Sequence, residues 1–194
     1  LPIWYAALVM DSEGVRYEKP KMKYIGLEAK KSSTPKHCRM WLVECYGLAM
    51  TEEESVLHAR VAEIKKEFMS KPIEDIAAPR SVNNLEKYQD AGSIYVKGTP
   101  KHVKAALFHN FLAENLPEAK GVGLINSGDK IKFVELKCNK YGFEVMGFQG
   151  FLPREFDMER YVDKQATFQK TFLDPLQVFL NAVGWNYEPK ASVM

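Results

Sequence analysis

The sequence predicts an α+β fold, in which small antiparallel strands come first and a mainly helical region with one short strand pair follows. An apolar run and a turn open the chain, and hydroxyl–proline pairs then precede segments whose apolar residues have helical spacing. Two short runs with strand-like composition follow in the second half. The 194 residues are 46% hydrophobic and 27% charged, which is ordinary for a globular chain and excludes wholesale disorder.

The predicted N-terminal strands lie within residues 4–28. Tyr5–Met10 is a short apolar run, and the sequence DSEG at residues 11–14 is typical of a turn with glycine in its last position. Residues 15–17 would form the returning strand and residues 21–28 a third one. We expect a small meander whose unpaired edge docks on a partner, because so few strands bury little surface alone.

Two helices are predicted next. Thr34 is the expected N-cap of the first, with Pro35 in its first turn and an end near Met50. The sequence TEEE at residues 51–54 repeats the start signal as a capping box. The second helix should then bury the face formed by Leu57, Val61, Ile64 and Phe68.

Prolines and the pair Asn83-Asn84 break the middle of the chain into short pieces. Thr99-Pro100 should start another helix, whose inward residues are Val103, Leu107, Phe111 and Leu112. Residues 121–128 are a predicted loop, and residues 131–136 and 143–148 a predicted strand pair. A last helix over residues 164–183 should be kinked by Pro175 and face inward with Phe172, Leu176, Phe179, Leu180 and Val183.

Composition excludes several classes of protein. No apolar run approaches the roughly 20 residues that span a bilayer, so we expect no membrane segment. Three cysteines without a Cys-x-x-Cys pair argue against a disulfide framework or structural zinc site and fit a reducing cytoplasm. The start, LPIWY, has no basic region typical of a signal peptide, and we expect the chain to be a piece of something longer.

Positive charge is concentrated rather than abundant. The formal net charge is only +2. The segment from Tyr17 to Arg39, however, contains seven basic residues and only two acidic ones. Within that run, residues 30–36 (KKSSTPK) join lysines to three hydroxyls at a helix start, and residues 97–104 (KGTPKHVK) repeat the pattern. Lysines attract phosphate, while hydroxyls and free helix N–H groups donate to it. The sequence predicts a polyanion-binding surface; an ordinary solvated basic face is the alternative.

Catalytic patterns are weak. Cys38 and Cys45 are seven residues apart among apolar neighbours, which predicts core packing. The histidines have no ligand spacing, no Asp-x-Asp pair could hold two metal ions, and no glycine-rich phosphate loop is present. We therefore predict no catalytic residue and no metal site in this chain. A thiol hydrolase using Cys38 stays open only if folding brings a histidine beside it.

Residues 16–36 (RYEKPKMKYIGLEAKKSSTPK) closely resemble B-family DNA polymerases of T-even-type phages, at the point where the palm passes into the thumb. The wider B family has a Lys, a Gly, a Glu, two bases and a polar residue here, which correspond to Lys23, Gly26, Glu28, Lys30, Lys31 and Ser32. Residues 97–104 resemble the basic segment of the thumb, and residues 187–192 the last ordered stretch of the phage enzymes. The resemblance therefore covers most of the chain.

The resemblance implies that residues 1–34 end a polymerase palm and residues 35–194 form a thumb that grips the minor-groove side of primer–template duplex. It also implies a set of residues that hold the DNA backbone without reading sequence. Tyr5 belongs to this set as the one residue kept from a Lys-Lys-Arg-Tyr-like motif. The full set is Tyr5, Lys23, Lys30, Lys31, Ser32, Ser33, Thr34, Lys97, Lys101 and Lys104.

The resemblance also implies what other components must supply. Nucleotidyl transfer with Mg²⁺ and dNTP would belong to an N-terminal portion with exonuclease, palm and fingers, so we expect this chain to be catalytically incompetent alone. A sliding clamp is a partner in the family, but the chain stops at Met194 without the Phe-rich tail that binds it. The expected location is the cytoplasm of an infected bacterium. The near-neutral charge keeps an alternative open, a stand-alone module that binds nucleic acid or protein without catalysis.

Overall fold

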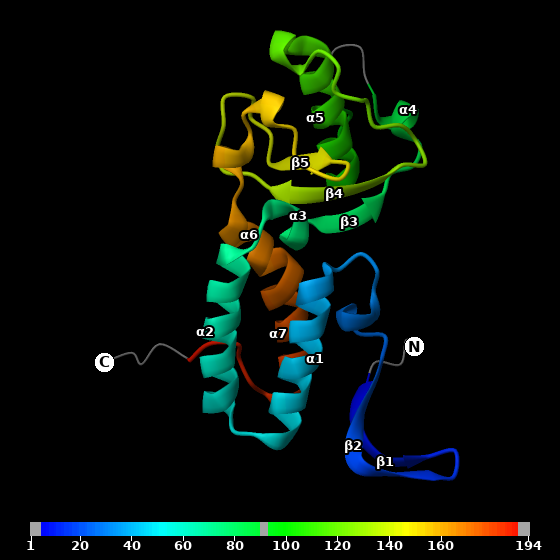
Figure 1. Ribbon diagram of the computed structural model, residues 1–194, viewed down its shortest axis with the longest axis vertical. Helices are drawn as coiled ribbons and strands as arrows, with labels where there is room; N and C mark the ends of the chain where they lie inside the picture. The colour runs from blue at the N-terminus through cyan, green and yellow to red at the C-terminus, as the bar shows by residue number, and fades with distance from the viewer. Residues whose placement is uncertain (1–4, 90–92, 190–194) are drawn as a thin grey trace. The chain divides into compact units, whose positions relative to one another are not determined.

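A computed structural model describes residues 5–89 and 93–189 and confirms the predicted α+β class (Figure 1). The chain forms two compact units. Unit 1 comprises residues 1–70 and 169–194, and unit 2 comprises residues 71–168. Within the described ranges, no helix has the length and apolar character needed to cross a membrane.

The N-terminal strands form a two-stranded hairpin, so the predicted three-stranded meander is wrong. Strands β1 (Tyr5–Ser12) and β2 (Val15–Ile25) are antiparallel, and Ser12 pairs with Val15. The connecting residues Glu13 and Gly14 have φ angles of +53° and +79°. Positive φ at both positions is the signature of a two-residue hairpin turn whose twist matches the strands.

Strand β2 continues through Pro20, where the sequence suggested a break. Val9 pairs with Lys21 and Asp11 with Arg16, so the register shifts over the segment that contains Pro20. A proline is tolerated in such a bulge because the missing N–H has no ladder partner there. One face of the hairpin packs against the helical part of unit 1, where Tyr24 contacts Tyr46 edge-on with ring centroids 6.4 Å apart.

Helix α1 (Lys36–Thr51) and helix α2 (Glu54–Ser70) occupy the predicted positions with different caps. Pro35, not Thr34, is the N-cap residue of α1, and it offers no side-chain cap. Thr51 ends α1 and donates its hydroxyl to the Gly47 carbonyl at 3.1 Å, so it does not cap α2. The hydroxyls of both threonines are therefore bonded to other groups, Thr34 to Glu28 at 3.3 Å and Thr51 to Gly47.

The core of unit 1 is aromatic. The four predicted inward residues of α2, namely Leu57, Val61, Ile64 and Phe68, are all buried. Trp41 of α1 lies between Phe68 and Phe172, with ring centroids 6.4 and 6.3 Å away. Tyr46 packs against Phe179 at 4.2 Å.

The C-terminal helical run is not a single helix. It comprises α6 (Lys164–Phe168), the π-helical segment η5 (Gln169–Leu173), α7 (Asp174–Leu180) and the 3₁₀ turn η6 (Asn181–Val183). Pro175 has no N–H and its ring crowds the carbonyl four residues back, so the wider π turn before it replaces the predicted kink. Phe172, Leu176 and Leu180 are buried as predicted, whereas Val183 is exposed.

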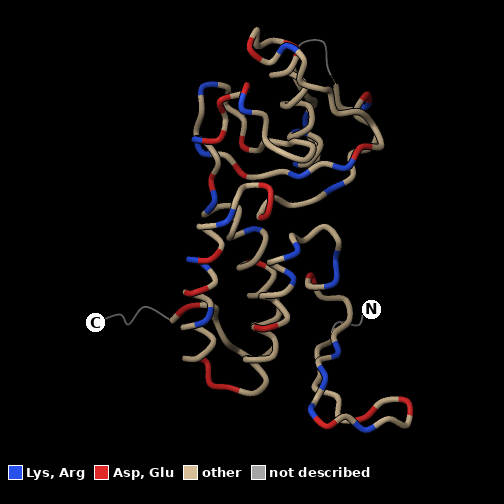
Figure 2. The backbone as a smooth tube through the Cα atoms, viewed as in Figure 1, with Lys and Arg blue, Asp and Glu red and all other residues tan. Residues whose placement is uncertain are grey.

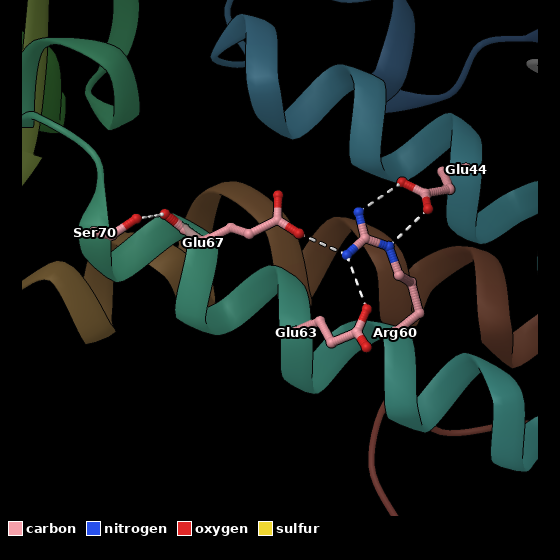
Figure 3. Close-up of polar contacts among 5 residues, drawn as sticks. All are labelled: Glu44, Arg60, Glu63, Glu67 and Ser70. Atoms are coloured by element: carbon pink, nitrogen blue, oxygen red, sulfur yellow. Dashed lines mark hydrogen bonds and ion pairs between the residues drawn. The ribbon is translucent and has the colours of Figure 1, made fainter.

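Arg60 of α2 joins the two long helices through three carboxylates (Figure 3). Its Nε and Nη2 donate to the two oxygens of Glu44 on α1 at 2.6 and 3.1 Å. Its Nη1 donates to Glu63 at 3.2 Å and to Glu67 at 2.6 Å. The hydrogen bonds to Glu44 and Glu67 raise the pKa of Arg60 further above its ordinary value.

We expect Arg60→Gln to lower the free energy of unfolding by about 1 kcal/mol, because three carboxylates then repel one another without a cation between them. Urea denaturation measures the change, which should shrink as salt is added. Arg160→Gln is the matched control, since Arg160 is exposed and forms an ion pair with a single carboxylate, that of Asp157, among the described residues. Equal losses in the two variants would contradict a special role for Arg60.

Unit 2 is built around the three-stranded antiparallel sheet β3-β4-β5 (Ala78–Ser81, Lys130–Glu135 and Val145–Phe148). The predicted strand pair is therefore confirmed, and β3 is an added edge strand. Pro79 is accommodated there because an edge strand needs fewer ladder donors. Besides α6, the described helical elements of the unit are α3 (Ile73–Ile76), α4 (Leu85–Tyr88), α5 (Lys101–Asn115), and the 3₁₀ turns η2 (Pro117–Ala119), η3 (Arg154–Phe156) and η4 (Glu159–Tyr161).

Helix α5 packs directly on strand β5 in unit 2. Val103, Leu107 and Leu112 are buried as predicted, while Phe111 is half-buried. Gly147 lies at the closest approach, where an added Cβ would stand 2.9 Å from the Ala105 carbonyl carbon. Only a residue without a side chain fits between the helix and the strand at this point.

His109 on α5 is buried between two backbone carbonyls. Its Nδ1 lies 3.0 Å from the Gly147 oxygen and its Nε2 lies 2.9 Å from the Gly123 oxygen. Burial lowers the pKa of His109, and the two carbonyls oppose this shift only in part. A neutral ring can donate to only one of the two oxygens.

We expect the free energy of unfolding to fall on acidification below pH 6.5, because the unfolded chain then binds a proton that the folded His109 resists. The contribution of His109 between pH 7 and 5.5 should be at most about 1 kcal/mol. His109→Gln should remove this part of the pH dependence, measured by chemical denaturation across the range. The opposite result would be a free energy of unfolding that rises on acidification in the parent chain but not in His109→Gln. It would show that the folded His109 ring binds the second proton.

Candidate nucleic-acid interface

The first basic cluster lies in the loop that leads from β2 into α1. Leu27 and Ala29 are buried and anchor the loop, which contains the 3₁₀ turn η1 (Glu28–Lys30). Backbone bonds from the Lys31 amide to the Glu28 carbonyl and from the Thr34 amide to the Lys31 carbonyl, at 3.0 and 3.1 Å, close two tight turns. The exposed residues Lys30, Lys31 and Ser32 stand on this fixed frame.

Glu28 organises the loop through its carboxylate. One oxygen pairs with the Lys31 ammonium, and the other accepts a 3.3 Å hydrogen bond from the Thr34 hydroxyl. Thr34 is buried, so its hydroxyl faces Glu28 rather than solvent, while Ser32 is exposed and Ser33 is half-buried. This role of Glu28 was not predicted, because no local sequence pattern links Glu28 to Thr34, six residues later.

Helix α1 presents an open N-terminus beside these cations. Pro35 supplies no side-chain cap, and the first intrahelical bond runs from the Arg39 amide to the Pro35 carbonyl at 3.0 Å. The N–H groups of the first helical turn therefore have no acceptor within the helix. Together with the helix dipole, they make this end attractive to an anion.

Further bases extend along the hairpin, where blue segments follow β2 towards α1 (Figure 2). Lys21 and Lys23 pair with Val9 and Ala7 and lie on the face opposite Tyr24. Tyr5 pairs with Ile25 on the same face as these lysines. The face that packs inward is therefore apolar, and the other face carries the predicted residues Tyr5 and Lys23.

Aromatic rings hold two of the lysines in this region. The Lys30 ammonium lies 5.2 Å from the Tyr24 ring centroid, and the Lys21 ammonium lies 3.9 Å from that of Tyr17. Such cation–π contacts restrict the side chain without neutralising its charge. The lysines stay available to a second, anionic partner.

Arg39 belongs with this cluster, although it was not among the predicted site residues. Its Nε is buried and has no hydrogen-bond partner among the described residues. A buried donor without an acceptor is costly, and Arg39 lies in the first turn of α1, where Pro35 offers no side-chain cap. The sequence signal for this residue was its position as the last base of the run from Tyr17 to Arg39.

The second basic cluster is in unit 2, at the start of α5. Lys97 is exposed, and the Lys104 ammonium lies 4.8 Å from the Tyr95 ring centroid. Lys101 donates to both oxygens of Glu135 at 3.0 Å, so its charge is partly compensated. Pro100 is the N-cap residue and offers no side-chain cap, as at α1.

Folding adds Arg80 and His102 to the second cluster. Burial, and then the nearby Arg80 charge, lower the pKa of His102. Arg80 comes from β3, whose pairing with β4 brings residues 78–81 next to residues 130–133. Arg80 was not predicted to belong to this cluster, because no local sequence pattern places residue 80 beside residue 102.

The cysteines of α1 belong to the core, as predicted. Cys38 and Cys45 are fully buried, and burial raises the pKa of each thiol to about 12. A thiol with that pKa is protonated at neutral pH and is a poor nucleophile. The ring of His37 is tilted against Trp41 at 5.8 Å. These positions do not fit the thiol-hydrolase alternative.

Comparison with known proteins shows that nearly the whole chain is similar to a part of two phage enzymes. The chain is 30% identical to the DNA-directed DNA polymerase of Enterobacteria phage T4 and 33% identical to that of Escherichia phage RB69, each over 97% of its residues. The chain is a distant homologue of part of these polymerases. It spans about a fifth of their length, 21% in each case. No family model matches the sequence.

This homology confirms the resemblance to phage DNA polymerases at the level of a shared portion. The palm assignment of residues 1–34, the thumb assignment of residues 35–194 and the DNA contacts stay predictions. The predicted similarity at residues 187–192 lies partly outside the described residues, because Lys190, Ala191 and Ser192 are not described. The same holds for Pro2, Ile3 and Trp4.

Proposed function

We propose that this chain is the palm–thumb portion of a phage replicative DNA polymerase and holds primer–template duplex through its phosphate backbone. The proposal rests on the geometry of the loop before α1, in a chain that is homologous to part of two phage DNA polymerases. There, Lys30, Lys31 and Ser32 are exposed on a rigid turn beside an uncapped helix N-terminus. This combination supplies charge, a hydroxyl and free N–H donors, which are the groups that contact phosphate.

Each predicted contact has its own role in the proposal. Lys23, Lys30 and Lys31 supply long-range attraction, Ser32 and Ser33 donate hydrogen bonds, and Tyr5 extends the surface along the hairpin. Thr34 acts through Glu28 by fixing the loop, because its hydroxyl is already bonded. Arg39 adds a cation to this first surface, and Lys97, Lys101 and Lys104 form a second one in unit 2.

Nucleotidyl transfer is assigned to a separate N-terminal portion with exonuclease, palm and fingers. Mg²⁺ and dNTP are assigned to that portion as well. The expected partners are that portion and primer–template DNA. The place of action is the cytoplasm of the infected bacterium.

The proposal is tested by measuring binding of labelled primer–template duplex, single-stranded DNA and duplex RNA to the intact chain over a salt series. We expect preference for the primer–template duplex, no dependence on base sequence, and an affinity that falls steeply as salt rises. Equal affinity for duplex RNA would favour the stand-alone module instead. Absence of binding to every probe at about 0.05 M salt would contradict the proposal.

A further inference from the structure

A cavity of about 540 Å³ in unit 2 has none of the predicted DNA contacts in its lining, and its residues Ile94 and Leu107 are each three residues along the chain from Lys97 and Lys104. Its size is within the range of ligand and peptide sites. One wall is a stripe on α5 at helical spacing, Leu107, Asn110, Phe111 and Glu114. The other described parts of the lining come from α4 with Gln89, from Ser93 and Ile94, and from the loop at residues 121–128.

The loop wall is fixed by Asn110. Its amide nitrogen donates to the Ile125 carbonyl at 2.8 Å, and its amide oxygen accepts from the Ile125 N–H at 2.8 Å. This two-bond clamp holds the loop main chain against α5. The cavity is therefore preformed, which reduces the entropy lost when a partner binds.

The lining combines apolar contact area with uncompensated negative charge. Ile125 and Leu107 are buried and form the floor, while Leu124 is 42% exposed and Phe111 is half-buried. Glu86 accepts hydrogen bonds from the Ser127 hydroxyl at 3.0 and 3.1 Å, and neither Glu86 nor Glu114 forms an ion pair among the described residues. The described residues that line the cavity include neither Lys nor Arg.

We infer that this cavity is a docking groove for a basic amphipathic segment of a protein partner. Apolar side chains of that segment would pack on Phe111 and Leu124, and its Lys or Arg would pair with Glu86 and Glu114. A nucleic acid is disfavoured here because phosphates would meet two carboxylates. The inference does not depend on the proposed DNA-binding role.

The test uses a fluorescein-labelled amphipathic helical peptide composed of leucine and lysine, titrated with the intact chain and followed by fluorescence anisotropy. Glu86→Gln with Glu114→Gln should weaken binding about tenfold, because two charge pairs at the rim are lost while shape is kept. Leu124→Ala should weaken it about fivefold through lost apolar contact. Circular dichroism and thermal melts verify that each variant is folded.

Glu52→Gln with Glu53→Gln is the matched control, since it removes the same charge from exposed residues of unit 1. This pair should change affinity less than twofold, and a peptide with glutamate in place of every lysine should not bind. Equal weakening by the two double variants would reduce the effect to general charge and overturn the inference. Failure of the parent chain to bind the lysine peptide up to about 1 mM would also overturn it.

Discussion

Duplex DNA binding by the Lys30→Ala, Lys31→Ala variant should be roughly 50-fold weaker than that of the parent chain at 0.1 M salt. Each lysine that neutralises a phosphate contributes about 0.9 to the slope of log affinity against log salt, so two lost contacts lower the slope by roughly two. The difference should therefore shrink steadily as salt approaches about 1 M. Loss of the Lys31 partner also leaves the Glu28 carboxylate facing the phosphates without a cation.

The matched control for this prediction is Lys65→Ala with Lys66→Ala. These residues are also adjacent, exposed lysines of unit 1, but they lie on α2 rather than in the loop before α1. The control should lose less than about threefold in affinity, because only general attraction is reduced. Fluorescence anisotropy with duplexes of several sequences measures both variants. A loss that depends on base sequence, or equal losses in both variants, would contradict phosphate holding by Lys30 and Lys31.

Gly147→Ala should lower the free energy of unfolding by about 3 kcal/mol. The new methyl group would lie 2.9 Å from the carbonyl carbon and 3.0 Å from the carbonyl oxygen of Ala105, which are backbone atoms within α5. A helix backbone cannot yield as a flexible side chain does, so α5 and β5 would separate. The same shift would disturb the contact of His109 with the Gly147 carbonyl.

Gly123→Ala is the control for Gly147→Ala, because the chemical change and the structural unit are the same. No atom lies within 4 Å of a Cβ built at Gly123. We expect its unfolding free energy, from urea denaturation, to differ from that of the parent by less than about 0.5 kcal/mol. A Gly147→Ala protein as stable as the control would show that the helix and strand can move apart without loss.

Elements with local signals could be predicted from the order of residues in the chain. The helical spacing of Leu57, Val61, Ile64 and Phe68 predicted the buried face of α2, since that face depends on helix geometry alone. The same spacing placed Cys38 and Cys45 in the core. The basic run from residue 17 to 39 could also be recognised in the sequence, as could the resemblance of this segment to phage DNA polymerases. Both are patterns of neighbouring residues.

Features that depend on residues far apart in the chain appear in the folded protein alone. Pro79 looked like a break, but pairing with residues 130–133 makes its segment an edge strand and brings Arg80 beside His102. Thr34 looked like a helix cap until the turn placed Glu28 within reach of its hydroxyl. The groove beside Asn110 likewise exists only once the loop returns to α5. Contacts between residues far apart in sequence leave no periodic pattern in the chain, so folding alone reveals them.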